Sequence, residues 1–369
     1  CIRDSLAIAV WASAFSAGSA LGPIVGGFLL EHFDWGSVFL IAVPVLIPLL
    51  IAAPLLVPES RDPNPGRIDI VSIVLSMAAM IPVVYAIKSL AVDGPSLTAG
   101  AWALLGVAMG YLFVRRQLTA EVPMLDMGLF RRGSFSGAIL VNLLSVVALV
   151  GFLYFVSQHL QLVLGLSPMM AGAALVPGML AMIVAGLSVV PISRRVPPHI
   201  LVPVGLVFSV AGYLLVAFTT SDHGIAPLVI AFVVLGIGIG GAETISNELI
   251  LSSAPAEKAG AASAVSETAY ELGAVLGTAV LGGLITAFYR GALVVPVDIP
   301  AEAAHAATET LAGAYTAAQE LPAQLGDALW DAASAAFGSG VMVTSLIGAG
   351  LVVLAGVIAA VTLRKAPAH

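Results

Sequence analysis

Long apolar stretches separated by short polar connectors run along almost the whole chain of 369 residues. Each stretch is long enough for an α-helix to cross about 30 Å of hydrocarbon, which takes about 20 residues. Ten such stretches are present, and we expect each to be a spanning helix. They lie at residues 5-30, 37-57, 70-91, 97-114, 135-157, 168-192, 199-219, 225-250, 260-289 and 339-363. The pattern therefore predicts an all-α integral membrane protein with ten spanning helices.

The connectors carry the residues expected of loops. Residues 58-69 are rich in proline, arginine and aspartate, and Val196-Pro197-Pro198 forms a second break. Residues 290-334 form the one long connector. Its alanine, glutamate and glutamine content, interrupted by three prolines, predicts short amphipathic helices outside the bilayer.

Composition strengthens the membrane interpretation and excludes several functions. The chain is 60% hydrophobic and 9% charged, with a mean hydropathy of +1.07, whereas soluble domains have about 25% charged residues. The single cysteine, Cys1, excludes an internal disulfide and a cysteine metal site. The histidines share no spacing, so we expect no metal and no cofactor. No basic stripe indicates nucleic-acid binding.

Basic residues predict the orientation of the spans. If the first residues are cytoplasmic, 12 of the 14 lysines and arginines fall on the cytoplasmic side, as the positive-inside rule requires. These are Arg3, Arg61, Arg67, Arg115, Arg116, Arg131, Arg132, Arg194, Arg195, Lys258, Arg364 and Lys365. The opposite side holds Arg290, and Lys88 falls in the outer half of a span. The acidic connector 290-334 is therefore expected to face outward.

The first apolar stretch contains an unusual ridge of glycines. Gly18, Gly22 and Gly26 recur every four residues and share one face, where a neighbouring helix can approach backbone to backbone. Pro23 adds a kink by removing a hydrogen bond, and Gly27 follows. Generic close packing and a family signature are both compatible with this run.

The run of Gly18, Gly22, Pro23, Gly26 and Gly27 resembles the antiporter motif in the fifth span of major facilitator drug/proton exporters. Residues 33-39 and 43-44 resemble the run that follows it in the fourteen-span subfamily. The resemblance implies that residues 1-57 are spans 5 and 6 of a first six-helix bundle. It likewise implies that residues 58-134 hold an inserted helix pair, spans 7 and 8, with a cytoplasmic loop, and that residues 135-369 form the second bundle, spans 9 to 14. Four further spans would precede Cys1, so an N-terminal truncation is expected.

Acidic residues inside the spans are the main candidates for chemistry. A carboxylate at mid-bilayer costs about 2.5 to 3.5 kcal/mol on insertion scales and is retained when it is partnered or used. Glu243 and Glu248 lie in the eighth stretch, with Glu248 near its boundary, and Glu267 and Glu271 lie in the ninth. At about 1.5 Å per residue, Glu243 and Glu267 sit about 10 Å deep and Glu271 about 17 Å.

Two roles for these acids stay open. Ser263, Ser266, Thr268 or Tyr270 could satisfy Glu267 and Glu271 structurally, or the two acids could form a binding site. The run from Ser266 to Gly273 looks like span 13 of the quaternary-ammonium exporters. That resemblance implies that Glu267 and Glu271 contact a cationic substrate or carry protons, and Glu243 is added because it lies at the same depth.

The predicted function is proton-coupled export of lipophilic, cationic drugs by alternating access, from the bacterial inner (plasma) membrane. The expected partners are the substrate, protons and lipid, and the expected state is a monomer. Export of an endogenous metabolite or antibiotic is the alternative within transporters. An integral-membrane enzyme or a sensor is the alternative outside them, although a Gly-x-Ser-x-Gly run, a His-Glu-x-x-His run and a phosphate-binding loop are absent from the sequence.

Overall fold

The computed structural model describes residue 18 and residues 21–56, 69–120, 123–219, 224–254 and 259–365. These parts of the chain form helices and connecting turns, and no β-strand occurs among them. Nine helices in the described residues are long and apolar enough to cross a membrane. They match nine of the ten predicted stretches. The other stretch, 5-30, lies largely outside the described residues, which show a helix from residue 21 to residue 32.

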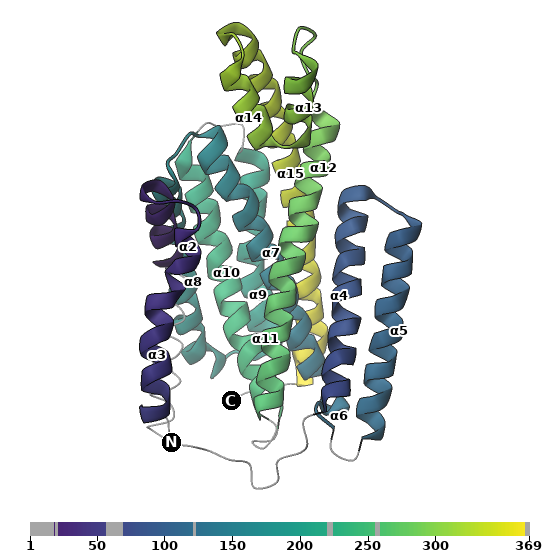
Figure 1. Ribbon diagram of the computed structural model, residues 1–369. Coiled ribbons are helices and arrows are strands. Elements are labelled where there is room, and N and C mark those ends of the chain that lie inside the picture. The colour runs from purple at the N-terminus through teal and green to yellow at the C-terminus, as the bar shows by residue number, and fades with distance from the viewer. Residues whose placement is uncertain are drawn as a thin grey trace.

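The elements follow one another in a simple order (Figure 1). They are α2 (Ser37–Leu40), α3 (Ala42–Leu56), α4 (Ile70–Asp93), α5 (Leu97–Thr119), α6 (Met127–Phe130), α7 (Gly133–Gln158), α8 (Pro168–Ser193), α9 (Pro198–Thr219), α10 (Ile225–Ser252), α11 (Ala259–Leu276), α12 (Gly282–Ala292), α13 (Ala301–Glu309), α14 (Leu311–Glu320) and α15 (Ala323–Thr362). Two π-helical turns, η1 (His159–Val163) and η3 (Gly277–Leu281), continue α7 and join α11 to α12, and a short 3₁₀ turn, η4 (Leu363–Lys365), follows α15.

The centre of the molecule is a bundle of α7 to α12 and α15. Its apolar core is built around aromatic side chains: Phe152 stacks on Phe232 with ring centroids 5.3 Å apart and meets Tyr213 edge-on at 5.7 Å. The hydroxyl of Tyr213 donates to the carbonyl of Ala148, 2.5 Å away. The buried phenol is thereby satisfied inside an apolar core, as a polar group there must be.

Glycines let α10 approach its neighbours on two sides. A Cβ on Gly236 would lie 2.7 Å from the carbonyl oxygen of Gly178 in α8, and one on Gly238 would lie 2.4 Å from that of Gly205 in α9. Real Cβ atoms do not come this close to backbone. Close approach through small residues is the usual way in which helices associate in lipid, and it fixes α10 between α8 and α9.

Two helix pairs flank the bundle on opposite sides (Figure 1). The helix of residues 21–32, with α2 and α3, lies along α8, where Ser167 donates a 3.1 Å hydrogen bond to the carboxylate of Glu31. The pair of α4 and α5 lies across the bundle, and α4 contacts α11, η3 and α12. The residues expected to form an inserted pair therefore form one antiparallel hairpin.

The last helix starts much earlier than predicted. We expected it to begin at residue 339, but α15 begins at Ala323 and runs for 40 residues. At 1.5 Å per residue this is about 60 Å, twice the thickness of the hydrocarbon. The first half of α15 therefore extends beyond the apolar layer, where it packs with α14. The predicted short helices of the long connector are confirmed as α13 and α14, and together with that half of α15 they form a compact cap.

Most of the described basic residues lie at the end opposite the cap (Figure 1). This end, which we call the basic end, holds α6, the turn between α8 and α9 and the last turns of α10 and α15. Arg132 bridges two of these segments by donating a 2.7 Å hydrogen bond to the carbonyl of Ser253. At the cap end, Arg290 donates to the carbonyl of Glu309. Arg3, Arg61, Arg67 and Lys258 lie outside the described residues.

Candidate functional site

The three predicted acidic residues lie on two neighbouring helices, α10 and α11. Glu267 and Glu271 lie four residues apart on α11, so they share one face, and both are exposed. Tyr270 lies beside them on the same helix and is half-buried. Glu243 comes from α10, which meets α11 through the hydrogen bond from Ser266 to Asn247. The structure thus places the three predicted acidic residues on two helices that touch each other.

Glu243 differs from the other two acids in its surroundings. Its side chain is half-buried, and its Oε1 atom is fully buried with no hydrogen-bond partner among the described residues. Residues 225–276 contain one basic residue, Lys258, which lies outside the described residues and beyond the end of α10. A buried carboxylate is costly unless a proton or a cation compensates it. Glu243 is therefore suited to binding one or the other.

Small residues let α11 approach α7 closely, on the face of α11 opposite to its acids. A Cβ on Gly273 would lie 2.9 Å from the carbonyl oxygen of Leu143, and one on Gly277 would lie 2.7 Å from that of Val147. Gly273 and Gly277 therefore form a small-residue seam whose partner is α7. Because this seam faces α7, Glu267 and Glu271 are turned to the exposed side of the helix.

A polar junction links three helices close to the acids. Ser266 of α11 donates a 2.9 Å hydrogen bond to Oδ1 of Asn247 in α10. The side-chain nitrogen of Asn142 in α7 donates to the Ser266 hydroxyl at 3.5 Å. Of the residues predicted to satisfy the glutamates, Ser266 therefore bonds to asparagines instead. The junction sets the position of α11 against α7 and α10 one turn before Tyr270.

Further buried polar atoms near this junction have no hydrogen-bond partner among the described residues. They are Oδ1 of Asn142 and the hydroxyls of Ser145 and Ser246. Unpartnered polar atoms in an apolar setting are rare, and they are usually explained by water or a ligand. Together with Glu243 they leave the interior at α7 and α10 with several polar atoms that no described side chain satisfies.

The glycine and proline motif lies against α8, but contact runs through only part of it. A Cβ on Gly27 would lie 2.5 Å from the carbonyl oxygen of Pro168, and the carbonyl oxygen of Pro23 lies 2.1 Å from where a Cβ on Gly172 would be. The ridge of Gly18, Gly22 and Gly26 instead has no described atom within 4 Å of its Cβ positions. The close approach that we expected on the ridge is made by the neighbouring face.

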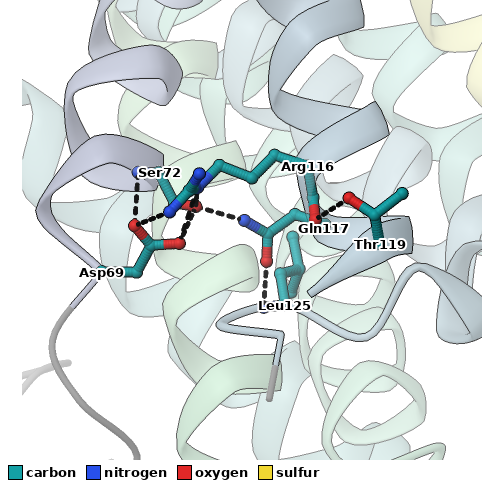
Figure 2. A network of polar contacts seen from close by, with 6 residues as sticks. All are labelled: Asp69, Ser72, Arg116, Gln117, Thr119 and Leu125. Atoms are coloured by element: carbon teal, nitrogen blue, oxygen red, sulfur yellow. Dashed lines mark hydrogen bonds and ion pairs between the residues drawn. The ribbon is translucent and has the colours of Figure 1, made fainter. Parts of the chain in front are cut away.

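A polar network at the base of the α4 and α5 hairpin was not predicted (Figure 2). Arg116 binds Asp69 through two 2.9 Å hydrogen bonds, one from Nε and one from Nη2. Ser72 joins them, donating to Asp69 and accepting from Gln117 at 2.7 Å. Gln117 in turn accepts from the backbone of Leu125 at 3.0 Å. The network therefore ties both helices to the linker that leads to α7.

Asp69 also begins α4, because its carboxylate accepts from the backbone N–H of Ser72 at 3.1 Å. The Arg116 guanidinium and the Ser72 hydroxyl hold the pKa of the Asp69 carboxyl well below its usual range. An aspartate before an apolar helix with a serine three residues on is a recognisable N-cap signal. The partner Arg116 is 47 residues away, and no local pattern points to it.

Two aromatic side chains in other spans take part in packing. Tyr85 meets Trp102 edge-on across the α4 and α5 hairpin, with ring centroids 5.5 Å apart, and Phe155 is buried in the core. The described residues contain no group of three histidine, cysteine or acidic side chains that could hold a metal ion.

Comparison with known proteins finds relatives that are named for drug efflux, resistance or export. The chain is 53% identical over 360 residues to the multidrug efflux pump LfrA of Mycolicibacterium smegmatis, which covers 98% of this chain and 71% of the relative. It is 33% identical over 334 residues to the methyl viologen resistance protein SmvA of Salmonella typhimurium, covering 90% and 68%. A tetracenomycin C resistance and export protein of Streptomyces glaucescens is 31% identical over 377 residues, covering 98% and 69%.

The family model of the Major Facilitator Superfamily matches residues 3–278. That range contains the glycine and proline motif, the α4 and α5 hairpin and the three site glutamates. With a match over most of its length and these relatives, the chain belongs to the Major Facilitator Superfamily.

Proposed function

We propose that this protein exports lipophilic cations in exchange for protons. Its family and relatives make it a multi-pass membrane transporter of small molecules rather than an enzyme. The finer assignment, to cationic substrates and proton coupling, is supported by the acids at α10 and α11. The observation that carries it is the placement of Glu243, Glu267 and Glu271 on two helices joined by the hydrogen bond from Ser266 to Asn247, in a part of the membrane domain without a described basic residue.

The different exposure of the three acids suggests which of them bind the cation and which binds the proton. Glu267 and Glu271 are exposed on α11 and accessible to a bulky cation, and Tyr270 beside them offers an aromatic face to it. Glu243 lies deeper, with a buried carboxylate oxygen, where a proton fits more readily than a drug. Each carboxylate can be neutralised by a proton or by a cation but not favourably by both, so the two ligands compete.

Competition for one acidic site becomes exchange when access alternates between the two sides of the membrane. A cation entering from one side displaces protons, and protons entering from the other side displace the cation. In our proposal, the motif of Gly18, Gly22, Pro23, Gly26 and Gly27 keeps the N-terminal helix packed closely on α8 during this movement. The close packing limits the leakage of ions. Only Gly27 and the Pro23 carbonyl show that close contact.

The setting that we propose is the bacterial plasma membrane, with a monomer as the working unit. The basic end faces the cytoplasm by the positive-inside rule, so the cap faces outward. The α4 and α5 hairpin supports assignment to the fourteen-span subfamily, in which such a pair is inserted between the bundles.

Export of an endogenous metabolite or antibiotic is a second candidate. The relative from Streptomyces glaucescens is named for resistance to and export of tetracenomycin C. The relatives named for multidrug efflux and methyl viologen resistance favour foreign and cationic substrates, and the three acids agree with the latter.

Transport by Glu267→Gln and Glu271→Gln variants tests the proposal. Inverted membrane vesicles would be loaded through a proton gradient with methyl viologen, a dication, and with ethidium, a monocation. We expect each variant to transport both substrates more slowly, and the dication to be affected more than the monocation, because each change removes a negative charge from the site. Glu302→Gln, on an exposed face of α13, is the matched control and should transport normally.

Wild-type rates in both site variants would reject the proposed role of these acids. Uptake that continues after the proton gradient is collapsed, with ATP maintained, would reject proton coupling. Turnover of a membrane lipid by the purified protein would instead support the enzyme alternative.

A further inference from the structure

A crevice opens on the surface of the bundle where α8, α9 and α10 meet near the basic end. It has a volume of about 220 Å³. Its walls are apolar, and residues at its rim are widely exposed: Val204 by 53%, Phe208 by 47% and Ile192 by 44%. No residue that the structure describes covers this rim. The crevice is lined by α8, α9 and α10 and is separate from the acids on α11.

Glycines create the hollow, and packing does not demand them there. A Cβ on Gly205 would lie 3.5 Å from the nearest atom, and one on Gly241 would lie 3.7 Å away, both ordinary contact distances. Elsewhere on α10, Gly236 and Gly238 leave no such room beneath the neighbouring backbone. At Gly205 and Gly241 the missing side chains thus leave open space along the crevice.

The crevice continues into a second, more polar hollow at the basic end. Ile192 lines both, and the second hollow, of about 460 Å³, is also lined by Arg194 and Arg195. Both arginines are exposed, and neither forms an ion pair with any residue that the structure describes. Two guanidinium groups that no described acidic side chain compensates therefore stand at the mouth of an apolar groove.

The two hollows together have an apolar part and a basic part, in the order that suits a lipid molecule at this end of the bundle. The crevice follows α8 from Ile192 back to Ala185, which is about 10 Å of depth at the rise of an α-helix. Guanidinium groups bind phosphate through paired hydrogen bonds. Basic pockets between spanning helices on the cytoplasmic side bind anionic head groups. An apolar groove ending in two arginines therefore has the polarity of one phospholipid molecule.

We propose that this crevice is a binding site for an anionic phospholipid of the cytoplasmic leaflet. Its phosphate lies between Arg194 and Arg195, and the upper part of one acyl chain lies in the groove over Gly205 and Gly241. The proposal rests on the orientation of the basic end and does not depend on the identity of the transported substrate. The lipid would brace the α8–α9 turn, whose helix α8 also carries the contact with the glycine and proline motif.

Native mass spectrometry of the purified protein with phosphatidylglycerol and with phosphatidylcholine tests the site. We expect tighter binding of phosphatidylglycerol, and we expect the double change Arg194→Gln and Arg195→Gln to weaken it by about tenfold or more. The matched control, Arg115→Gln with Arg131→Gln, removes the same charge from exposed residues of the same end and should bind normally.

A second pair of variants tests the acyl chain. Gly241→Leu should fill the groove and weaken phosphatidylglycerol binding, and Gly350→Leu should not, because Gly350 is exposed on α15 with no described atom within 4 Å of its Cβ position. Size-exclusion chromatography and thermal unfolding would show that each variant is folded, and Gly205→Leu replaces Gly241→Leu if that variant is not.

Equal binding of the two lipids would overturn the proposal, as would wild-type affinity in either the arginine variant or the groove variant. A dimer that dissociates when Gly241 is replaced by leucine would overturn it too, because a second copy of the chain would then occupy the crevice.

Discussion

At the scale of single residues, the three acids lie in different surroundings. Glu243 has a buried carboxylate oxygen, whereas Glu267 and Glu271 are exposed. A charge in an apolar stretch is rare and easily found, but how Glu243 lies relative to the other two depends on how α10 and α11 pack, and no local pattern contains that arrangement. The same limit explains why Ser266, predicted as a partner for the glutamates, instead bonds to Asn247.

The Ser266 junction gives a prediction at this scale. Ser266→Ala should lower the free energy of unfolding by about 1 kcal/mol, because two asparagines lose a partner and hydrogen bonds between membrane helices average about 0.6 kcal/mol each. Ser263→Ala, on the exposed side of the same helix, is the control and should change little. Unfolding titrations in mixed detergent would measure both. Equal stability of the two variants would show that the junction does not hold the helices.

At the scale of helices, hydropathy located the spans well but misplaced their ends where a helix leaves the apolar layer. Residues 323–338 carry Asp327 and Asp331 and are less apolar than the span that follows. The hydropathy pattern therefore placed the beginning of the last span at residue 339. Helix propensity does not end there, because alanine continues the helix through water as well as lipid. The result is one helix of 40 residues that serves both the membrane and the cap.

Chemical labelling tests the extent of α15. With Cys1 replaced by serine, Asp331→Cys should react from outside intact cells with a maleimide that does not cross membranes. Val353→Cys should not react, because residue 353 lies about 33 Å further along the helix, by the helical rise, on a lipid-facing surface. Protection of Asp331→Cys would mean that the first half of α15 is inside the membrane, and labelling only in inverted vesicles would reverse the orientation.

The hairpin of α4 and α5 yields a prediction about its ion pair. Asp69→Asn and Arg116→Gln should each speed amide hydrogen exchange in the first turn of α4, and the double variant should add little, because the two residues act as one unit. Thr119→Val, at the end of α5 that carries Arg116, is the control. If the two single effects simply added, the pair would not be coupled.

The pKa of Asp69 sets the pH range of that effect. Because the folded-state pKa lies below the unfolded value of about 3.9, the stabilisation is complete above that value and is lost as the pH falls through the folded-state pKa. Exchange at the start of α4 should therefore differ between wild type and Asp69→Asn at neutral pH, and the difference should shrink in strong acid. A difference that grows with acidity would contradict this assignment.

At the scale of the whole molecule, a rigid bundle carries the site on its exposed face. The α7 seam and the Ser266 junction fix α11, while Glu267 and Glu271 stay open to a ligand and Glu243 lies behind them. Sequence could predict the family and most of the spans, because glycine, proline and apolar patterns are local. The Asp69 and Arg116 pair and the crevice at α8, α9 and α10 depend on the folded arrangement, and both became visible only there.

The most direct test of exchange measures protons during substrate binding. In a weakly buffered solution of the purified protein, addition of methyl viologen should release protons, because the cation displaces them from the carboxylates. The triple change Glu243→Gln, Glu267→Gln and Glu271→Gln should abolish the release, and Glu302→Gln should leave it unchanged. Proton release of wild-type size from the triple variant would contradict the claim that cation and proton compete for these three acids.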